Sequence, residues 1–416
     1  MTGQASKRGG LRRAFSHRNF ALYTAGNFPS QIGVWAQRVA IGWLAWELTK
    51  SPFILGVIGF ADLIPIVFLN PFAGYFTDRF DRLRLAKILQ FMNFVVTSLL
   101  TVCAYAGWLQ IELLILFAFL TGIDHALFQP VRSSLNSVLV PPEDRPTAIA
   151  FGGLSWNSAR FVGPALGGVL IPTAGPNFVF LLNAILYGWF FAALWLLRLS
   201  PTPKRAPSKI GVIGEIIAGY RYSLGHPVIG TLFIMLGGAS FLVRPVVELL
   251  PGFAAGVFER GPEGLAWLTS AMGVGAMISS LWVTQRGRTD GLARIATHSL
   301  LLAMAVLIVF AYSPRFEIAV LCMAAVGLQY SLFATCIQVI IQTIADEHMR
   351  GRVLALYGML WIGMAAFGAL ATGALSEILG LRLPIALDGA AIFLVWFWAV
   401  RSQNRVNAEL AKRGID

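Results

Sequence analysis

Long apolar runs separated by short charged links dominate this sequence. Twelve such runs follow one another along the 416 residues, and the chain is 57% hydrophobic, only 12% charged and has a mean hydropathy of +0.70. An apolar helix of about 20 residues spans the hydrocarbon core of a bilayer, whereas about a quarter of the residues in soluble domains are charged. The sequence therefore predicts an all-α integral membrane protein with twelve transmembrane helices.

The basic residues lie mainly on one side of the predicted membrane. Of the 32 Lys and Arg residues, 25 lie in the two tails or the even-numbered links, four lie in the odd-numbered links and three lie within apolar runs. Because Lys and Arg accumulate in cytoplasmic segments of membrane proteins, we expect both termini to be cytoplasmic. The short tails fit a bacterial inner (cytoplasmic) membrane. This topology also accounts for the net charge of +12, and we expect no nucleic-acid partner.

The longest link divides the chain into two halves. It contains three prolines and several basic residues and is expected to form an extended tether followed by a surface-lying helix at 210–224. The predicted organisation is a cytoplasmic N-tail at 1–19, a six-helix bundle at 20–198, a cytoplasmic interdomain linker at 199–226, a second six-helix bundle at 227–401 and a cytoplasmic C-tail at 402–416.

The two halves resemble each other in sequence. A shift of 207 residues aligns residues 77–88 with 284–295. A shift of 205 residues superposes Trp156 on Trp361, Gly163 on Gly368 and Gly168 on Gly373. Because six spans separate the repeats, both halves enter the membrane from the same side, as in transporters that rock two bundles about a central site.

A short polar link, GYFTDRFDRLR, follows the second apolar run at residues 74–84. It resembles the signature loop of the major facilitator superfamily, and the stretches 48–52 and 78–82 resemble the enterobactin and macrolide exporter branch of that superfamily. The resemblance continues through 138–168 and 350–373, so it covers most of the chain. It implies the major facilitator fold, with two pseudo-symmetric six-helix bundles, and transport by alternating access.

The resemblance also implies a conformational latch that joins the halves in the outward-open state, formed by Gly74, Asp78, Arg79 and Arg82. Asp78 would accept backbone N–H groups at the start of the eleventh span, near Arg350 or Gly351. An anion at a helix N-terminus stabilises it by about 0.3–1 kcal/mol. Glu143 or Asp144 would brace the arginines of the latch.

The fifth apolar run contains a helix-packing motif, Gly163, Pro164, Gly167 and Gly168. Proline bends a helix and glycine allows a neighbouring helix to approach closely. The motif resembles the core of the superfamily's antiporter motif, although Ala150 and Ala159 replace the upstream glycines of that motif. A packing role and a directional role in export are both open.

Six ionisable residues lie deep within apolar runs, where an isolated charge costs several kcal/mol: Arg38, Asp62, Asp124, Arg160, Arg244 and Glu248. The first two lie about ten residues from their shared link, so they are expected at one depth in a hairpin. The last two are one helical turn apart. Asp124 and Arg160 reach similar depths from neighbouring helices, which makes Arg160 the predicted ion-pair partner of Asp124.

These charges are either structural ion pairs or parts of a transport mechanism. The family architecture implies that helices 1, 4, 7 and 10 line a central cavity. The proton-coupling candidates are then Asp62, Asp124 and Glu248, and the candidates for lining the substrate cavity are Arg38, Arg244, Gln329, Tyr330 and Gln338. The arginines of that set could also bind an anionic substrate.

The sequence carries no HExxH, GxSxG or GxxxxGK[ST] motif and no Cys/His spacing typical of a metal site, so we expect neither an enzyme nor an ATP-driven pump. We expect a proton-coupled secondary exporter of small amphipathic molecules, such as a drug or siderophore. It would act as a monomer in the lipid bilayer, with no cofactor and with the proton gradient as its energy source. The alternatives are a lipid or lysolipid flippase or an importer on the same fold, or a non-transporting sensor.

Overall fold

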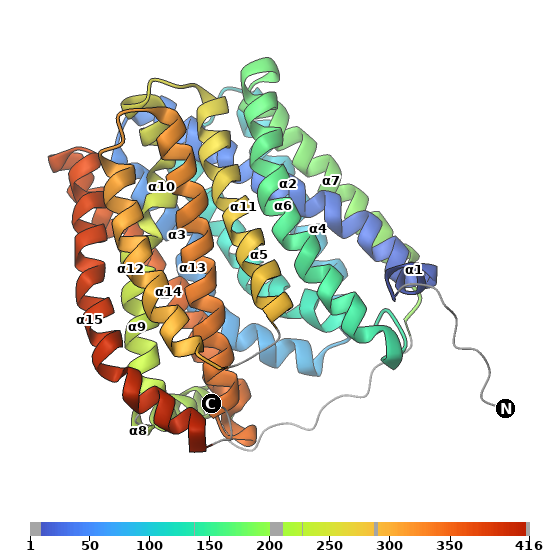
Figure 1. The fold of residues 1–416 in the computed structure, drawn as a ribbon. Coiled ribbons are helices and arrows are strands. Elements are labelled where there is room, and N and C mark those ends of the chain that lie inside the picture. The colour runs from blue at the N-terminus through green and yellow to red at the C-terminus, as the bar shows by residue number, and fades with distance from the viewer. Residues whose placement is uncertain (1–9, 137, 200–210, 227, 287–289, 413–416) are drawn as a thin grey trace.

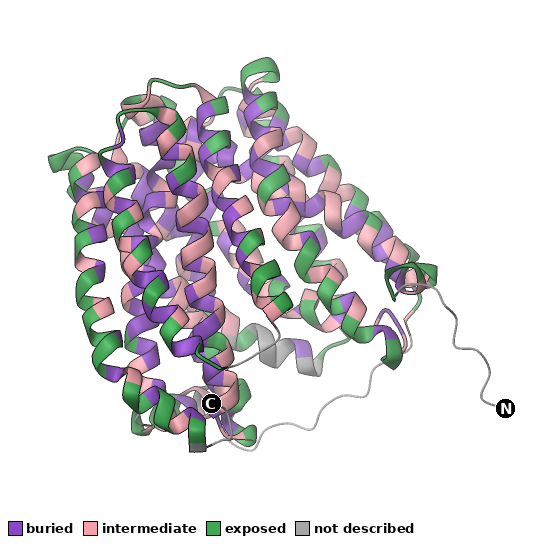
Figure 2. Ribbon diagram, in the orientation of Figure 1, coloured by how far each residue is buried: buried purple, intermediate pink, exposed green. Residues whose placement is uncertain are grey.

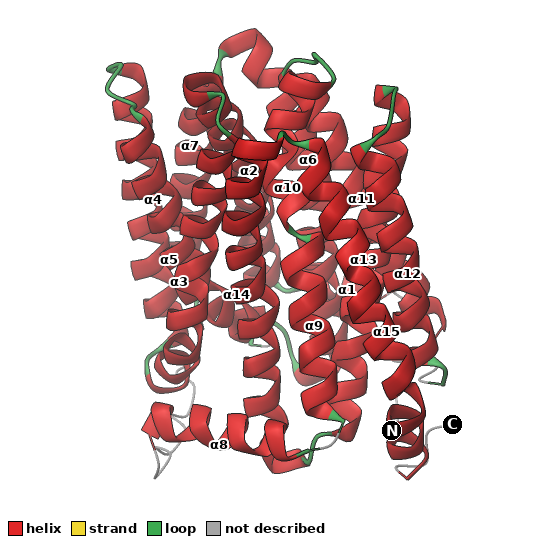
Figure 3. Ribbon diagram, turned by 90° about the vertical axis from the view of Figure 1, so that its left-hand side faces the viewer, coloured by secondary structure: helices red, strands yellow, loops and turns green. Residues whose placement is uncertain are grey.

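The computed structural model describes the chain except residues 1–9, 137, 200–210, 227, 287–289 and 413–416. Side chains at 71, 73–76, 78–79, 212–213 and 412 also lie outside the described set, although their backbone is helical. All regular structure in the described part is helical (Figure 3).

The first half and the linker contain α1 (Gly10–Ser16), α2 (Arg18–Thr49), α3 (Pro52–Arg79), α4 (Arg82–Tyr105), α5 (Ile111–Asn136), the 3₁₀ turn η1 (Pro142–Asp144), α6 (Arg145–Ala174), α7 (Pro176–Leu196) and α8 (Gly211–Gly225). The second half contains α9 (Ile229–Val243), α10 (Pro245–Gly252), the π-helical turn η2 (Phe253–Val257), α11 (Pro262–Arg286), α12 (Leu292–Ala311), α13 (Phe316–Ile344), α14 (Glu347–Leu379) and α15 (Arg382–Lys412). The last helix therefore continues well past residue 401, where the predicted C-tail begins.

Ten segments of the described chain are long and apolar enough to cross a membrane, and α9, α10 and η2 together form one of them. The helices α2 and α6 are not among the ten, although they are 32 and 30 residues long. Polar side chains lower their hydropathy, because α2 buries Asn27, Gln31 and Gln37 and α6 carries Arg160. With these two helices the fold has the twelve spans that the apolar runs predict.

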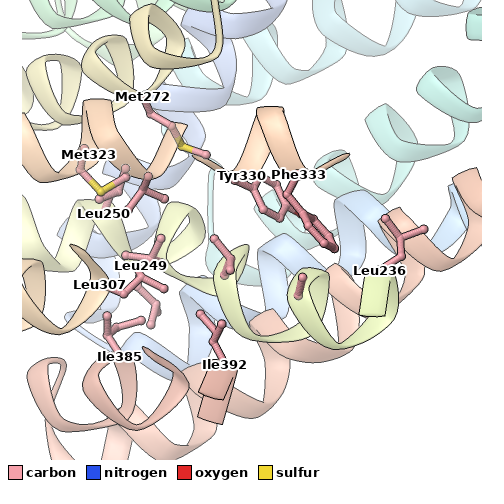
Figure 4. Packing of buried hydrophobic residues seen from close by; sticks show 14 of the residues in the cluster. Leu236, Leu249, Leu250, Met272, Leu307, Met323, Tyr330, Phe333, Ile385 and Ile392 are labelled. Atoms are coloured by element: carbon pink, nitrogen blue, oxygen red, sulfur yellow. The ribbon is translucent and has the colours of Figure 1, made fainter. Parts of the chain in front are cut away.

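The helices pack through apolar side chains on the inside of each half (Figure 2). In the second half, Leu249 and Leu250 of α10 lie beside Leu307 of α12 and Met323 of α13, all fully buried (Figure 4). Other large apolar side chains, such as Ile378, are exposed on the outer surface. In a bilayer these face lipid, so helix association depends on close packing and not on exclusion of water.

The internal repeat has a direct counterpart in the packing. A side chain at Gly163 would collide with the backbone of α2 at Ile32, and one at Gly368 would collide with the backbone of α9 at Phe241. Both contacts join two helices of the same half. The glycines five residues later, Gly168 and Gly373, instead meet the opposite half, against α11 and α3 respectively.

The first described helix, α1, and the end of α15 lie towards one end of the helix bundle, which we call the termini face (Figure 1). At the opposite face the halves are in contact, since Ser51 Oγ donates to Glu377 Oε2 at 2.7 Å and Trp46 packs against Gly252 and Gly256. Towards the termini face, α6 and α11 diverge (Figure 1). The structure is therefore closed at the opposite face, with its halves apart at the termini face.

The linker helix α8 lies across the termini face, roughly perpendicular to the spans (Figure 3). Its bounds lie within a residue of the predicted surface helix at 210–224. It contacts the beginning of α14, because Tyr222 Oη accepts the backbone N–H of Asp346 at 3.1 Å and Glu215 lies 3.7 Å from Arg352. The linker helix is thus attached to the second half.

Candidate functional site

A cavity of about 400 Å³ lies between the two halves. Its volume is in the range of small-molecule sites, which are about 300–1,000 Å³. Most of its wall comes from α2 to α7, and the second half contributes Arg244, Trp361 and Ile362. Its polar and charged lining includes Asn27, Gln31, Arg38, Asn70, Gln90, Asn93, Asp124, His125, Gln129, Arg132, Arg160 and Arg244.

An ion-pair network connects the halves beside this cavity. Arg38 Nη2 lies 2.8 Å from Asp62 Oδ2 and donates to Glu248 Oε1 at 3.1 Å. Glu248 also accepts from Arg244 Nη2 at 3.3 Å. The Arg38–Asp62 pair expected from depth and the Arg244–Glu248 pair expected from helical spacing are therefore both present. The Arg38–Glu248 contact adds a link across the halves that the sequence does not predict.

The expected pair of Asp124 and Arg160 is not formed, and that prediction is wrong. Asp124 Oδ1 accepts a hydrogen bond from Asn93 Nδ2 of α4 at 2.6 Å. The Arg160 guanidinium instead lies over the ring of Trp35 in α2, 5.6 Å from its centroid, and has no ion pair among the described residues. The two side chains reach similar depths but leave their helices in different directions.

Two further ionisable residues, His125 and Arg132, line the cavity. His125 Nδ1 lies 4.0 Å from Asp62 Oδ1, and its Nε2 is buried without a hydrogen-bond partner in the described protein. Arg132 follows the fourth apolar run of the sequence, but α5 continues to Asn136 and places this residue in the cavity wall. Its guanidinium stacks 4.3 Å from the ring centroid of Trp156. A longer reading of the fourth span would have found it.

The predicted cavity residues of the tenth span are placed elsewhere. Neither Gln329, Tyr330 nor Gln338 lines the cavity described above, and Gln338 is exposed. Tyr330 is buried behind Trp361, with ring centroids 4.2 Å apart. Among the described residues, the second half lines this cavity with Arg244, Trp361 and Ile362.

The predicted latch is only partly described. The side chains of Gly74, Asp78 and Arg79 lie outside the described residues, while Arg82 begins α4. The expected N–H donors near Arg350 and Gly351 lie inside a helix, because α14 begins at Glu347 and the Arg350 amide already donates to Asp346 O at 2.8 Å. The expected position of these donors is therefore wrong by about one helical turn.

Asp144, one of the two acids expected to brace the latch, has other partners. Asp144 Oδ1 accepts from Arg13 Nε at 2.5 Å, and Asp144 Oδ2 accepts from His17 Nε2 at 2.8 Å. Its side chain is only 2% exposed. The hydrogen bond from His17 holds the pKa of Asp144 below its ordinary value, and Arg13 acts in the same direction. Asp144 thus anchors the N-terminal helix α1 to the link before α6.

The helix-packing motif has contacts consistent with close packing. Gly163 and Gly167 lie against α2, Gly168 lies against Ala266 of α11, and Pro164 lines a smaller cavity.

A buried acid that the sequence does not single out, Asp388 of α15, accepts a hydrogen bond from Thr372 Oγ1 at 2.8 Å. It lies outside the central cavity. The described residues contain no cluster of three metal-ligating side chains.

Comparison with known proteins agrees with this architecture. Residues 13–413 match a family model described as a transmembrane secretion effector, MFS_3. The staphyloferrin A transporter of Staphylococcus aureus is 25% identical over 403 residues, which cover 94% of this chain and 99% of that protein. The multidrug efflux pump Tap of Mycolicibacterium fortuitum is 26% identical over 90% of this chain and 94% of its own length. The enterobactin exporter EntS of Escherichia coli is 24% identical over 92% and 88%.

Solved structures share the fold at low sequence identity. A bacterial homologue of the human lysosomal transporter Spinster, in an inward-facing and occupied conformation, superposes with a TM-score of 0.73 at 14% identity, covering 95% of this chain and 98% of that one. The nucleoside transporter NupG superposes with a TM-score of 0.72 at 12% identity, covering 92% and 98%. The chain therefore belongs to the transmembrane secretion effector family of the major facilitator superfamily, and it is an integral membrane transporter and not an enzyme.

Proposed function

We propose that the protein is a proton-coupled secondary exporter of small amphipathic molecules that works by alternating access. The central cavity carries this proposal, because it lies between the halves and combines aromatic side chains with charged groups. The relatives named as a multidrug efflux pump and an enterobactin exporter support an exported small molecule. No cofactor is required, since the proton gradient supplies the energy.

The charge distribution supports a cytoplasmic termini face in a bacterial inner membrane. With that orientation, the halves are apart on the cytoplasmic side and closed on the outer side. Opening the outer side requires the halves to separate there, which breaks the Arg38–Glu248 contact. Glu248 would then have different partners in the two states. A charged group can be coupled to a conformational change only when its interactions differ between the states.

Among the three proton-coupling candidates, the contacts favour Asp124. Asp62 and Glu248 both lie within 3.1 Å of Arg38, so a proton on either would weaken an ion pair. Asp124 lines the cavity, and its carboxylate accepts a hydrogen bond from the neutral amide of Asn93. Its carboxyl group can change charge without breaking an ion pair. We propose that Asp124 carries the proton and that Asp62 and Glu248 respond to the change of state.

Purified protein in liposomes tests this function. A pH gradient is imposed and internal pH is followed while a panel of siderophores, macrolides, dyes and lysolipids is offered. We expect substrate-dependent proton flux in the wild type and its loss in Asp124→Asn. Asp388→Asn is the matched control, because it removes a buried carboxylate outside the cavity, and its flux should equal that of the wild type.

Other outcomes separate the alternatives. Movement of a compound without proton flux would contradict proton coupling and favour a flippase or a uniporter on the same fold. Uptake driven by the gradient would establish an importer. Proton flux that persists in Asp124→Asn but disappears in Asp62→Asn would assign the proton to the ion-pair network instead.

A further inference from the structure

Three arginines form a layer across the transport route. Arg38, Arg160 and Arg244, together with Trp35, line both the 400 Å³ cavity and a second cavity of about 60 Å³. The second cavity is otherwise lined by residues closer to the opposite face, such as Gly42 and Leu265. The layer therefore lies between the two spaces, where a substrate must pass when the protein changes state.

The carboxylates near this layer are divided unequally among the three arginines. Asp62 binds Arg38, and Glu248 is divided between Arg38 and Arg244. Arg160 has no carboxylate partner and no hydrogen-bond acceptor among the described side chains. Its guanidinium contacts the ring of Trp35. The positive charges of Arg244 and Arg38 also act on it. An unpaired charge this deep in a membrane protein is costly, and one cation–π contact offsets only part of that cost.

The surroundings of Arg160 match an anionic group attached to an apolar body. A guanidinium binds a carboxylate or phosphate with two parallel hydrogen bonds. Trp35 and Trp156 meet edge to face at 5.6 Å beside it, and Phe128 lines the same cavity. Buried polar atoms of Gln31, Gln90 and His125 in the cavity wall have no protein hydrogen-bond partner in the described chain. These atoms can bind further polar groups of a substrate.

We propose that the exporter selects anionic, carboxylate-bearing amphipathic substrates and that Arg160 is the residue that binds the anionic group. This inference rests on the proposed transport function and names its substrate class. Arg38 is already neutralised by two carboxylates, and Arg244 shares one. Arg160 therefore contributes most to the preference for an anion.

Equilibrium binding to a matched pair of probes tests the inference. Dansylglycine carries a carboxylate, and dansylglycinamide is its uncharged counterpart. Energy transfer from the protein's tryptophans to the dansyl group reports binding to purified protein, without any pH gradient. We expect the wild type to bind dansylglycine about tenfold more tightly than the amide, since hydrogen bonds to charged groups are the stronger ones. In Arg160→Gln this ratio should fall to near one, with affinity for the amide unchanged.

Two further variants make the assignment specific. Arg132→Gln removes the same group from the same cavity, but Arg132 already donates to Gln129 and stacks on Trp156, so the preference should persist. If this variant loses as much preference as Arg160→Gln, the assignment to Arg160 is overturned. Arg160→Lys keeps the charge and the fold but cannot form two parallel hydrogen bonds. Its preference should fall severalfold, and an unchanged preference would contradict the proposed geometry.

The inference and the transport proposal can fail separately. Equal affinity of the wild type for the two probes overturns the anion preference whatever the outcome of the proton-flux assay. A clear anion preference without proton flux in liposomes would support the binding role of Arg160 while contradicting proton-coupled export.

Discussion

The contact between Arg38 and Asp62 makes a prediction that can be worked out from the structure. Arg38→Gln removes the cation that faces two buried carboxylates, whose side chains are 11% exposed in Asp62 and 10% exposed in Glu248. Glu248 retains Arg244 at 3.3 Å. Among the described residues, Asp62 retains only His125, whose Nδ1 lies 4.0 Å from Asp62 Oδ1. The loss therefore falls mainly on Asp62.

Breaking a buried ion pair from one side costs about 3–5 kcal/mol, because the remaining charge is left uncompensated. We expect Arg38→Gln to reduce the free energy of unfolding by this amount. Asp62→Asn alone should cost about 1 kcal/mol, the scale of one hydrogen bond, because Arg38 still binds Glu248. Adding Asp62→Asn to Arg38→Gln should recover about half of the loss, giving a coupling energy of about 3 kcal/mol.

The assay is equilibrium unfolding in mixed detergent micelles, with all four proteins of the cycle measured under the same conditions. Glu248→Gln in the Arg38→Gln background is the matched control, because Glu248 keeps a cation when Arg38 is removed, and it should recover less than Asp62→Asn does. If the two double variants are equally stable, or if Arg38→Gln costs less than about 1 kcal/mol, the assignment of the loss to Asp62 is wrong.

Three further predictions concern other parts of the fold. Asp144→Asn should lower the melting temperature at neutral pH. The pKa of Asp144 is depressed in the folded state, so its carboxylate stabilises the fold above the ordinary carboxyl pKa, and this stabilisation is lost as pH falls through the folded pKa. The melting temperatures of wild type and variant should therefore converge below about pH 4. A series of melting curves at different pH values checks this. Gly163→Ala should cost about 1–3 kcal/mol by overpacking, whereas Gly153→Ala on the same helix meets nothing within 4 Å and should be nearly neutral in the same unfolding assay. Asp388→Asn should change stability by less than about 1 kcal/mol, since an amide oxygen can accept the same hydrogen bond; a larger loss would show that the carboxylate charge is needed.

Spans, halves and some ion pairs could be predicted because they depend on distance along the chain. Apolar length fixes a span, and the repeat offset of 205 residues fixes which helices are equivalent. Arg244 and Glu248 share a helix face, and Arg38 and Asp62 are equally far from one short link, so their depth is determined. In each case the number of residues between two points of the chain sets their relative position in the membrane.

The rest depends on the direction in which each side chain leaves its helix. Depth places Asp124 level with Arg160, but rotation about the helix axes turns one towards α4 and the other towards α2. The tenth span shows the same limit, because Gln338 is exposed and does not line the cavity that the family architecture suggested for it. Only the packing of neighbouring helices sets these rotations.

The paired glycines of the repeat have a mechanical consequence. Gly163 and Gly368 hold helices together within a half, while Gly168 and Gly373 make the contacts between halves at small residues, Ala266 and Gly56. At these two points no long side chain separates the helices, so their backbones approach closely. Because the duplication placed one such contact on each side of the molecule, we expect the two together to serve as the pivot of the rocking motion that the proposed transport cycle requires.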